Sequence, residues 1–196
     1  MPATPLRPAV FLDRDGVIIE HRDDYVKSLA EVYFIPGAVE ALARLARHDY
    51  LTVIATNQSA IGRGLMTRAD ADAINAHILE RIAAAGGRVD GLYLCPHRPE
   101  DGCACRKPAP GMLLDAARDL GVDLGASVMI GDALTDVLAA QAAGVKPILV
   151  LTGLGHRQTQ ELIPPELNHT LRVPDLATAI ERLLGEPPRP TKKPPV

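Results

Sequence analysis

The stretch Phe11-Leu12-Asp13-Arg14-Asp15-Gly16-Val17 places two carboxylates two residues apart, directly after an apolar run and directly before a glycine. This order predicts a buried strand that delivers both aspartates to the carboxyl edge of a sheet, where ligands bind in open α/β folds. Residues two apart in an extended chain lie on the same side, so Asp13 and Asp15 can address one metal ion and one substrate atom. Because crowded carboxylates resist ionising together unless a cation lies between them, the pattern favours Mg²⁺.

Strand and helix signals alternate along the chain, which predicts an α/β fold: a three-layer α/β/α, doubly wound, mostly parallel sheet. Short apolar runs, typical of strands covered on both faces, predict strands at 9–12, 51–55, 91–94, 127–130 and 147–151. Helical periodicity predicts helices at 36–47, 68–85, 111–120, 134–143 and 177–184. Thr67 and Asp70 have the spacing of a capping box at the start of the second helix.

The length of 196 residues predicts one domain, which we place at residues 1–185, including a loop at 95–105 that is discussed below. The remaining residues, 186–196, are dominated by proline and lysine and have too little apolar surface to pack, so we expect a disordered tail. The segments that separate Asp13, Thr56 and Lys107 are filled by ordinary elements, so no large cap domain is expected.

Composition argues against several classes of protein. The net charge is −3, with no tryptophan and only two phenylalanines, so the chain lacks the basic field and the aromatics of a nucleic-acid-binding protein. It also lacks an apolar run long enough for a membrane span and an apolar N-terminal segment typical of a secretory signal. We therefore expect a cytoplasmic protein with a small-molecule partner, and a monomer.

Asp-x-Asp-Gly alone is also ordinary turn chemistry, so its meaning depends on what the other predicted strand ends carry. The second strand ends at Thr56, followed by Asn57-Gln58-Ser59, where a hydroxyl and backbone N–H groups can hold phosphate oxygens. Arg106-Lys107 supplies cations suited to phosphoryl groups. Asp132 follows the fourth strand and can complete a metal shell, and Asp136 either supports that shell or favours the start of the next helix.

Strand ends that carry Asp/Asp, Thr, Lys and Asp in this order form the four-motif pattern of the haloacid dehalogenase-like phosphohydrolases, which the chain resembles from about residue 8 to 150. The resemblance implies that Asp13 is the nucleophile, which forms an aspartyl-phosphate, and that Asp15 is the general acid and base. It also implies that Asp13, the Asp15 backbone carbonyl and Asp132 hold Mg²⁺, and that Thr56 and Lys107 hold the phosphoryl group.

All three cysteines of the chain lie in one short loop, as Cys95, Cys103 and Cys105, together with His97. An odd number of clustered cysteines in a protein expected in the cytoplasm argues against disulfides, and a Cys₃His set is typical of structural Zn²⁺. The alternative is a flexible loop without a metal. Because the loop continues directly into Arg106-Lys107, zinc would stiffen the segment that carries the phosphate-binding cations.

Within this fold, a Cys-x-His loop followed by Cys-x-Cys-Arg-Lys-Pro is similar to the histidinol-phosphatase-related subgroup, as are the sequences at 24–26 and 110–112. The resemblance implies removal of the 7-phosphate of a D-glycero-D-manno-heptose 1,7-bisphosphate in nucleotide-heptose (lipopolysaccharide core) biosynthesis, with either anomer left open. It implies distal-phosphate binding by Arg106 and sugar contacts from residues 22–25. Ala133 occupies a position where many members carry lysine. The predicted substrate-binding residues are Arg14, Arg22, Asp23, Asp24, Tyr25, Asn57, Gln58, Ser59, Arg63 and Arg106.

Two other functions are weighed against this one. Histidinol-phosphate phosphatase would use the same loop and catalytic set, but its imidazole-containing substrate favours an acidic or aromatic pocket, for which the chain offers few aromatics. A second phosphate instead needs a second anion site, which Arg106 and Arg63 can provide. A zinc-loop binding module without catalysis would need a basic face and stacking aromatics. His21 has no motif partner and is expected to be a surface or core residue.

Overall fold

The computed structural model describes residues 5–158 and 170–185, and within these ranges the chain forms a six-stranded sheet in which all neighbouring strands are parallel. The strand order is β3-β2-β1-β4-β5-β6. The strands are β1 (Arg7–Leu12), β2 (Leu51–Asn57), β3 (Gly91–Cys95), β4 (Val122–Gly131), β5 (Lys146–Val150) and β6 (Leu171–Val173). The predicted parallel α/β sheet is therefore confirmed.

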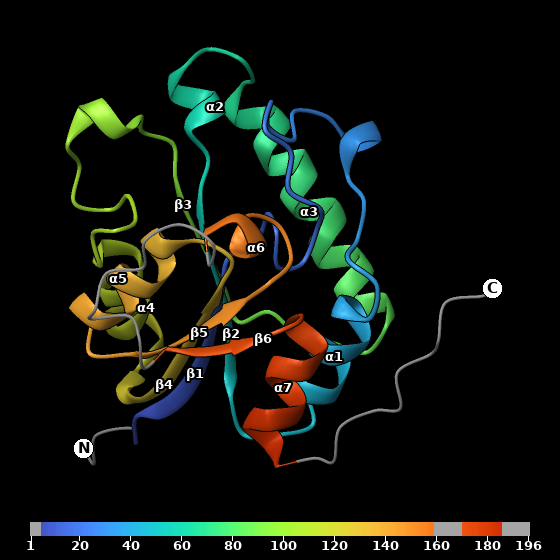
Figure 1. The fold of residues 1–196 in the computed structure, drawn as a ribbon, viewed down its shortest axis with the longest axis vertical. Coiled ribbons are helices and arrows are strands. Elements are labelled where there is room, and N and C mark those ends of the chain that lie inside the picture. The colour runs from blue at the N-terminus through green and yellow to red at the C-terminus, as the bar shows by residue number, and fades with distance from the viewer. Residues whose placement is uncertain (1–4, 159–169, 186–196) are drawn as a thin grey trace.

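Helices cover both faces of the sheet and complete the predicted three layers (Figure 1). Val10 and Leu12 of β1 pack into the apolar layer on one face, and Ala9 and Phe11 pack into the layer on the other. All four are fully buried, as expected for a central parallel strand. One face carries α1 (Ala38–Leu45), α3 (Arg68–Ala84) and α7 (Leu176–Leu184), and the other carries α4 (Gly111–Leu120) and α5 (Leu134–Ala142).

Local sequence accounts for where the helices begin. α3 starts with the predicted capping box: the Asp70 backbone N–H donates to Thr67 Oγ1 (3.1 Å), and the Thr67 N–H donates to Asp70 Oδ2 (2.9 Å). α1 starts two residues later than predicted, at Ala38, because Gly37 adopts a left-handed conformation (φ +82°) that a right-handed helix cannot include. Pro36 therefore precedes the helix.

Two strands differ from the sequence prediction. β6 was not predicted, because three residues are too few to show a strand pattern. β4 starts at Val122 rather than at residue 127, and its pairing with β1 shifts register between Pro8 and Val10. At this irregularity the Ala9 backbone N–H donates to Ser127 Oγ (2.8 Å) in place of a ladder bond. The sequence signal is interrupted there because residues 125 and 126 are exposed and small.

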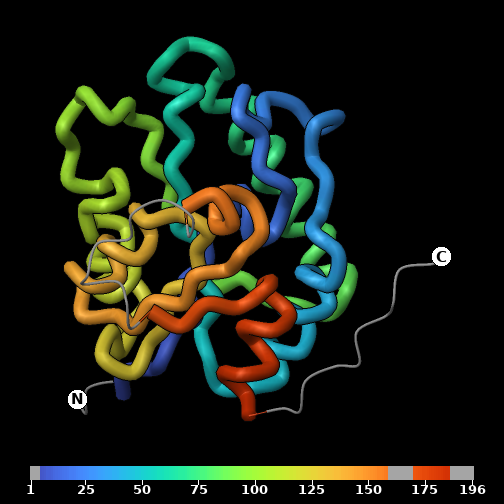
Figure 2. Tube along the Cα trace, viewed as in Figure 1, coloured from blue at the N-terminus to red at the C-terminus, as the bar shows by residue number. Residues whose placement is uncertain are grey.

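The order of the strands creates a switch point at the centre of the sheet. The chain proceeds outward from β1 to β2 and β3, and then returns to place β4 on the other side of β1. The loops after these strands project from the same end of the molecule (Figure 2). In doubly wound folds, ligands bind in the crevice at such a point, beyond the carboxyl ends of the strands. Short helices in these loops are η1 (Leu29–Glu31), α2 (Ser59–Gly62), η2 (Pro99–Asp101) and α6 (Gly155–Gln158).

The tail predicted at 186–196 lies outside the described residues, so its disorder and the domain limit at residue 185 stay predictions. In the described ranges, no helix has both the length and the apolar character needed to cross a bilayer.

Candidate active site

A cavity of about 180 Å³ lies at the switch point, beyond the carboxyl ends of β1, β2 and β4. Asp13 and Asp15 line it from the loop after β1, and Asp132 lines it from the loop after β4. Arg106 and Tyr25 also line it, from the loops after β3 and β1. The fold therefore gathers at one place residues that are far apart in the sequence.

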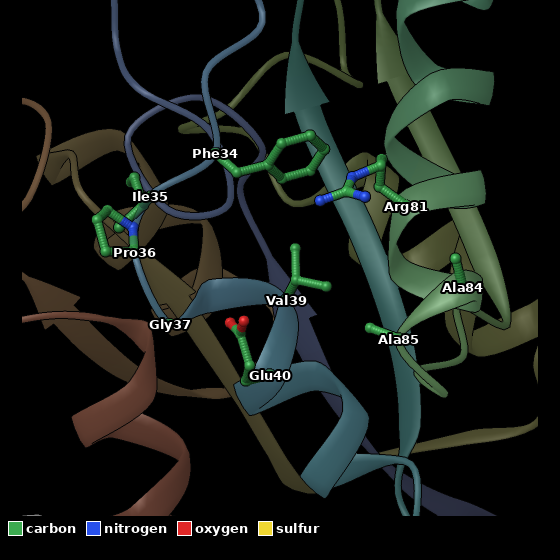
Figure 3. Close-up of a pocket in the computed structure, with 9 residues that line it drawn as sticks. All are labelled: Phe34, Ile35, Pro36, Gly37, Val39, Glu40, Arg81, Ala84 and Ala85. Carbon is green, nitrogen blue, oxygen red and sulfur yellow. The ribbon is translucent and has the colours of Figure 1, made fainter.

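A second cavity, of about 250 Å³, lies between the start of α1 and the end of α3 (Figure 3). Phe34, Val39 and Glu40 line it together with Arg81, whose guanidinium lies 5.7 Å from the centre of the Phe34 ring. This cavity contains one carboxylate and no cluster of polar groups among its described lining residues, so it does not resemble the polar cavity at the switch point.

Lys107 is the electrostatic centre of the site. Its side chain is 1% exposed, and its Nζ lies 3.1 Å from Asp13 Oδ2 and 2.6 Å from Asp136 Oδ1. The same Nζ donates a hydrogen bond to the Ala55 carbonyl (2.8 Å) at the end of β2. Asp136 also accepts a hydrogen bond from the Ala133 backbone N–H (3.0 Å), so it both pairs with Lys107 and caps the start of α5. The two roles weighed for Asp136 from the sequence thus occur together.

The site holds more negative charge, from three neighbouring carboxylates, than the single positive charge of Lys107 offsets. Asp13, Asp132 and Asp136 bring ligand oxygens within 4.8 Å of one another. Burial, opposed by Lys107 and reinforced by Asp136, raises the pKa of Asp13 to about 6. Burial and the neighbouring Asp13 and Asp136 raise the pKa of Asp132 well above its ordinary value. Such a cluster gains stability from an added cation, and oxygen ligands of this kind suit a divalent ion such as Mg²⁺.

Two glycines without side chains leave the space that the Asp132 carboxylate occupies. A Cβ at Gly16 or at Gly153 would overlap Asp132 Oδ2, and both glycines have positive φ. The Leu154 backbone N–H donates to Asp132 Oδ2 (2.8 Å), and Thr152 Oγ1 donates to the Gly16 carbonyl (2.6 Å). The glycine of Asp-x-Asp-Gly is therefore required by the approach of a third carboxylate as well as by the turn.

Asp15 is held by two neighbours. Arg14 donates from Nε to Asp15 Oδ2 (3.0 Å) and from Nη2 to Asp15 Oδ1 (3.1 Å), while Gln58 Nε2 donates to Asp15 Oδ2 (2.7 Å) and to Thr56 Oγ1 (2.9 Å). Arg14 was predicted to contact substrate, but its side chain is fully buried and bonded to Asp15 and Asn75. The structure therefore gives Arg14 an interior position in place of one on the cavity wall.

The loop after β2 is tied to the loop after β3 through Asn57. Its Nδ2 donates to the Lys107 carbonyl (3.1 Å), and its Oδ1 accepts from the Lys107 backbone N–H (3.1 Å). Asn57, Gln58 and Ser59 all line the cavity. Thr56 is buried and accepts from Gln58, which leaves its own hydroxyl proton to be donated.

Cys95, His97, Cys103 and Cys105 converge as the sequence predicts, with their ligand atoms within 4.8 Å of one another. The sulfur–sulfur separations are 3.6, 3.1 and 3.4 Å, and His97 Nδ1 lies 3.6 and 3.3 Å from the Cys95 and Cys105 sulfurs. Zn–S bonds of about 2.3 Å in tetrahedral geometry place sulfurs about 3.8 Å apart, close to these separations. The three cysteines form no disulfide. The donor set therefore fits a closed structural zinc site.

The two arginines expected to bind a distal phosphate have different positions. Arg106 lines the cavity, and its Nη1 donates to the His97 carbonyl (3.1 Å), so its direction depends on the cysteine-rich loop. Arg63 instead pairs with Glu100 of η2 (3.7 Å) and is not among the described residues that line the cavity. The expected pairing of Arg63 with Arg106 in one anion site is thus not seen.

The segment after β1 contributes part of what was predicted. Arg22 and Tyr25 line the cavity, and Tyr25 has a positive φ of +69°, which is uncommon for a residue other than glycine. Asp24 is instead exposed and pairs with Arg22 (3.0 Å), and exposed Asp23 lies 3.4 Å from His21 Nε2. Asp23 also accepts a hydrogen bond from Arg157 (2.9 Å), and neither aspartate is among the described residues that line the cavity.

Sequence reasoning missed several lining residues. His21 lines the cavity, although it was expected to be a surface or core residue. Thr135 and Leu154 also line it, from the start of α5 and from the loop after β5. None of the three belongs to a motif. The sequence offered one signal, closeness to Asp132 along the chain, which Thr135 shows and which His21 and Leu154 do not.

Comparison with known proteins agrees with this geometry. The HAD-hydrolase-like family model matches residues 104–179. A D-glycero-beta-D-manno-heptose-1,7-bisphosphate 7-phosphatase of Bordetella bronchiseptica is 45% identical over 177 residues, 90% of this chain and 98% of that protein. The protein of the same name from Pseudomonas aeruginosa is 43% identical over 178 residues, 91% and 98% of the two chains.

A solved structure gives the same result in three dimensions. It is D,D-heptose 1,7-bisphosphate phosphatase from B. bronchiseptica, crystallised as a complex with magnesium and phosphate. Its chain superposes with a TM-score of 0.85 at 44% sequence identity, covering 91% of this chain and 98% of that one.

The Asp136–Lys107 pair generates the first prediction. Replacing Asp136→Asn should lower the free energy of unfolding by about 2 kcal/mol, because the buried Lys107 ammonium loses one of its two carboxylate partners and keeps Asp13. Urea denaturation measures this loss. Asp115→Asn is the matched control: Asp115 forms an exposed pair with Arg118, so its loss should cost less than about 0.5 kcal/mol. Equal losses in the two variants would contradict the importance of the buried pair.

Proposed function

The chain belongs to the D-glycero-beta-D-manno-heptose-1,7-bisphosphate 7-phosphatase family, and from this we propose that it hydrolyses the 7-phosphate of the β-anomer of that sugar bisphosphate. It is a phosphoric monoester hydrolase of the haloacid dehalogenase-like superfamily. The observation that carries the proposal is the placement of Asp13 between Lys107 and the crowded carboxylate Asp132 at the switch point of the sheet.

We propose Mg²⁺ as the catalytic cofactor. Asp13, the Asp15 backbone carbonyl and Asp132 would hold it, and the raised pKa values of the two buried carboxyl groups are the physical reason that a cation is favoured there. The related B. bronchiseptica enzyme was crystallised with magnesium and phosphate. When bound, Mg²⁺ would offset the negative charge of the carboxylates and of the phosphoryl oxygens.

In the first step, an oxygen of Asp13 attacks the phosphorus atom of the 7-phosphate. The bond from phosphorus to the sugar oxygen breaks, Asp15 gives its proton to that oxygen, and an aspartyl-phosphate and the sugar alcohol result. We assign Lys107, which lies next to Asp13, and the Thr56 hydroxyl to holding the phosphoryl oxygens during transfer; both side chains are buried and neither is among the described residues that line the cavity. Asp15 Oδ2 already accepts from Gln58 and Arg14, so Oδ1, with fewer donors, has more capacity for the proton.

In the second step, water attacks the phosphorus atom of the aspartyl-phosphate. Asp15, now a carboxylate, takes a proton from this water, and the bond between phosphorus and the Asp13 oxygen breaks. Inorganic phosphate is released, and the Asp13 carboxylate is restored. The two aspartates thus keep separate roles, one covalent and one in proton transfer.

The distal 1-phosphate is assigned to Arg106, which lines the cavity wall. Arg22 and Tyr25, on the same cavity, are assigned to the sugar, with His21 added by the structure. Histidinol phosphate has a single phosphate and would leave Arg106 without an anion. The bisphosphate therefore fits the charges of the cavity better.

The Cys₃His cluster is proposed to bind structural Zn²⁺ through Cys95, His97, Cys103 and Cys105. Its role would be to hold the loop whose next residues are Arg106 and Lys107. Because the His97 carbonyl accepts a hydrogen bond from Arg106, the metal loop and the distal-phosphate site are in direct contact.

The proposed setting is the cytoplasm, where nucleotide-heptose precursors of the lipopolysaccharide core are made, and the proposed partner is the phosphosugar alone. We propose a monomer without a membrane partner, and the net charge of −3 argues against a nucleic-acid partner.

The test of the function is phosphate release from the β and α anomers of heptose 1,7-bisphosphate and from histidinol phosphate. We expect Mg²⁺-dependent release with a strong preference for the β anomer. Asp13→Asn should abolish turnover and leave the fold intact, because the amide cannot act as the nucleophile. Near-normal turnover by this variant would remove Asp13 as nucleophile, and release from histidinol phosphate alone would remove the sugar substrate.

The assignment of Arg106 gives a further prediction. Arg106→Ala should raise KM for the bisphosphate about tenfold or more and leave KM for a small monophosphate nearly unchanged, because only the bisphosphate loses a charged hydrogen bond. Steady-state kinetics on both substrates measure this. Arg63→Ala is the matched control, since Arg63 pairs with Glu100 away from the cavity, and it should change neither value. Equal losses on both substrates would contradict the distal-phosphate contact.

The cysteine cluster gives another prediction. Cys103→Ser should lower bound zinc from about one ion per chain and lower the melting temperature, because a closed structural site needs all its ligands. Metal analysis of the purified protein and thermal unfolding measure the two effects. Glu100→Gln, in the same loop but outside the cluster, is the control. Unchanged zinc content in the cysteine variant would refute the site.

A further inference from the structure

We propose that Arg14 is a positioning residue which, anchored by Asn75 of α3, fixes the carboxyl group of Asp15 for proton transfer. This inference rests on the acid–base role proposed above for Asp15. Arg14 touches neither the expected position of the phosphoryl group nor the cavity wall, so it would act only through Asp15.

The burial of Arg14 is the first reason. Its side chain is 0% exposed, and a guanidinium is almost never fully buried unless it is paired. Its charged partner is Asp15, a carboxylate at the candidate active site. Removing a charge from water at this point is costly, and the ion pair that offsets the cost is made with the proposed acid and base.

The geometry of the pair is the second reason. Nε and Nη2 of Arg14 donate to the two different oxygens of Asp15, at 3.0 and 3.1 Å. A contact at two points restrains rotation of the carboxyl plane, which a single contact would allow. The Asp15 side chain keeps 20% of its surface exposed and lines the cavity, so the restrained group still faces the substrate.

The anchor on α3 is the third reason. Arg14 Nη1 donates to Asn75 Oδ1 at 2.9 Å, and Asn75 is 4% exposed in the middle of a helix that packs into the core through Ala71, Ile74 and Ile78. A helix interior is a rigid support compared with the loop that carries Asp15. The hydrogen bonds from Arg14 to Asn75 and to Asp15 thus link the loop that carries Asp15 to the core on one face of the sheet.

Dependence on the leaving group separates this role from a general structural one. A sugar alkoxide must be protonated as it leaves, whereas p-nitrophenolate leaves readily without a proton. Arg14→Lys keeps the positive charge but loses the two-point contact. The second step, hydrolysis of the aspartyl-phosphate, is common to both substrates, so the comparison uses kcat/KM, which reports only the steps up to the departure of the leaving group. We expect kcat/KM for heptose 1,7-bisphosphate to fall about tenfold or more, and kcat/KM for p-nitrophenyl phosphate to fall less than about threefold.

Three variants complete the test. Asp15→Asn should show the same dependence on the leaving group with a larger loss; if it does not, the acid–base role of Asp15 fails, and this inference fails with it. Asn75→Ala removes the anchor but keeps the ion pair, and it should show a smaller loss of the same kind; it also serves if Arg14→Lys does not fold. Arg44→Lys weakens a distant, partly buried pair with Glu181 and should affect both substrates alike.

The outcome that overturns the proposal is specific. If Asp15→Asn depends on the leaving group but Arg14→Lys loses activity equally on both substrates, or on neither, then Arg14 only stabilises the fold. The same conclusion holds for Asn75→Ala when it is the variant used. Thermal unfolding of each variant measures its loss of stability. The loss of activity can then be compared with that of Arg44→Lys, which changes stability without touching the site.

Discussion

The geometry of the site depends on one buried cation, the ammonium group of Lys107, which lies between two carboxylates. Removing such a charge from water is costly unless it is well paired, so a fold that buries Lys107 must bring Asp13 and Asp136 to it. These two residues follow β1 and β4, which are neighbours in the sheet and meet at its switch point. The same interaction therefore fixes the proposed nucleophile and links the loop after β3 to the centre of the sheet.

The two aspartates of Asp-x-Asp-Gly are separated by their partners. Asp13 pairs with Lys107, and Asp15 pairs with the fully buried Arg14. Each of the two buried cations thus takes one carboxylate of the motif, which offsets the repulsion between them and gives each a different environment. Asp132, seated against two glycines and next to Asp13, adds the further negative charge that favours Mg²⁺. Chemistry that needs a nucleophile and a separate acid is consistent with this division.

The residues that we propose to select the substrate lie on loops whose positions do not depend on the carboxylate cluster. Arg106, which we propose as the ligand of the distal phosphate, donates to the carbonyl of His97, so its direction depends on the arrangement of the Cys₃His loop. Arg22, which also lines the cavity, pairs with Asp24, and Tyr25 adopts a left-handed backbone. Because these contacts come from loops of different strands, their relative placement can change between relatives without loss of the carboxylate cluster. This separation explains why shared catalytic residues alone leave the sugar and its anomer open.

The sequence by itself determined the features that depend on local pattern: the parallel α/β sheet, the capping box of α3, and the motif residues that end β1, β2 and β4. The Cys₃His cluster could also be predicted from the sequence, because its four ligands lie close together along the chain. Tertiary structure alone decided what depends on contacts between distant segments. It placed Arg14 in the interior against Asn75, 61 residues away, paired Arg63 with Glu100, and brought His21 and Leu154 to the cavity. The physical reason is that periodicity and spacing report which side of an element is buried, whereas the partner that each buried charge meets is set by how the elements pack.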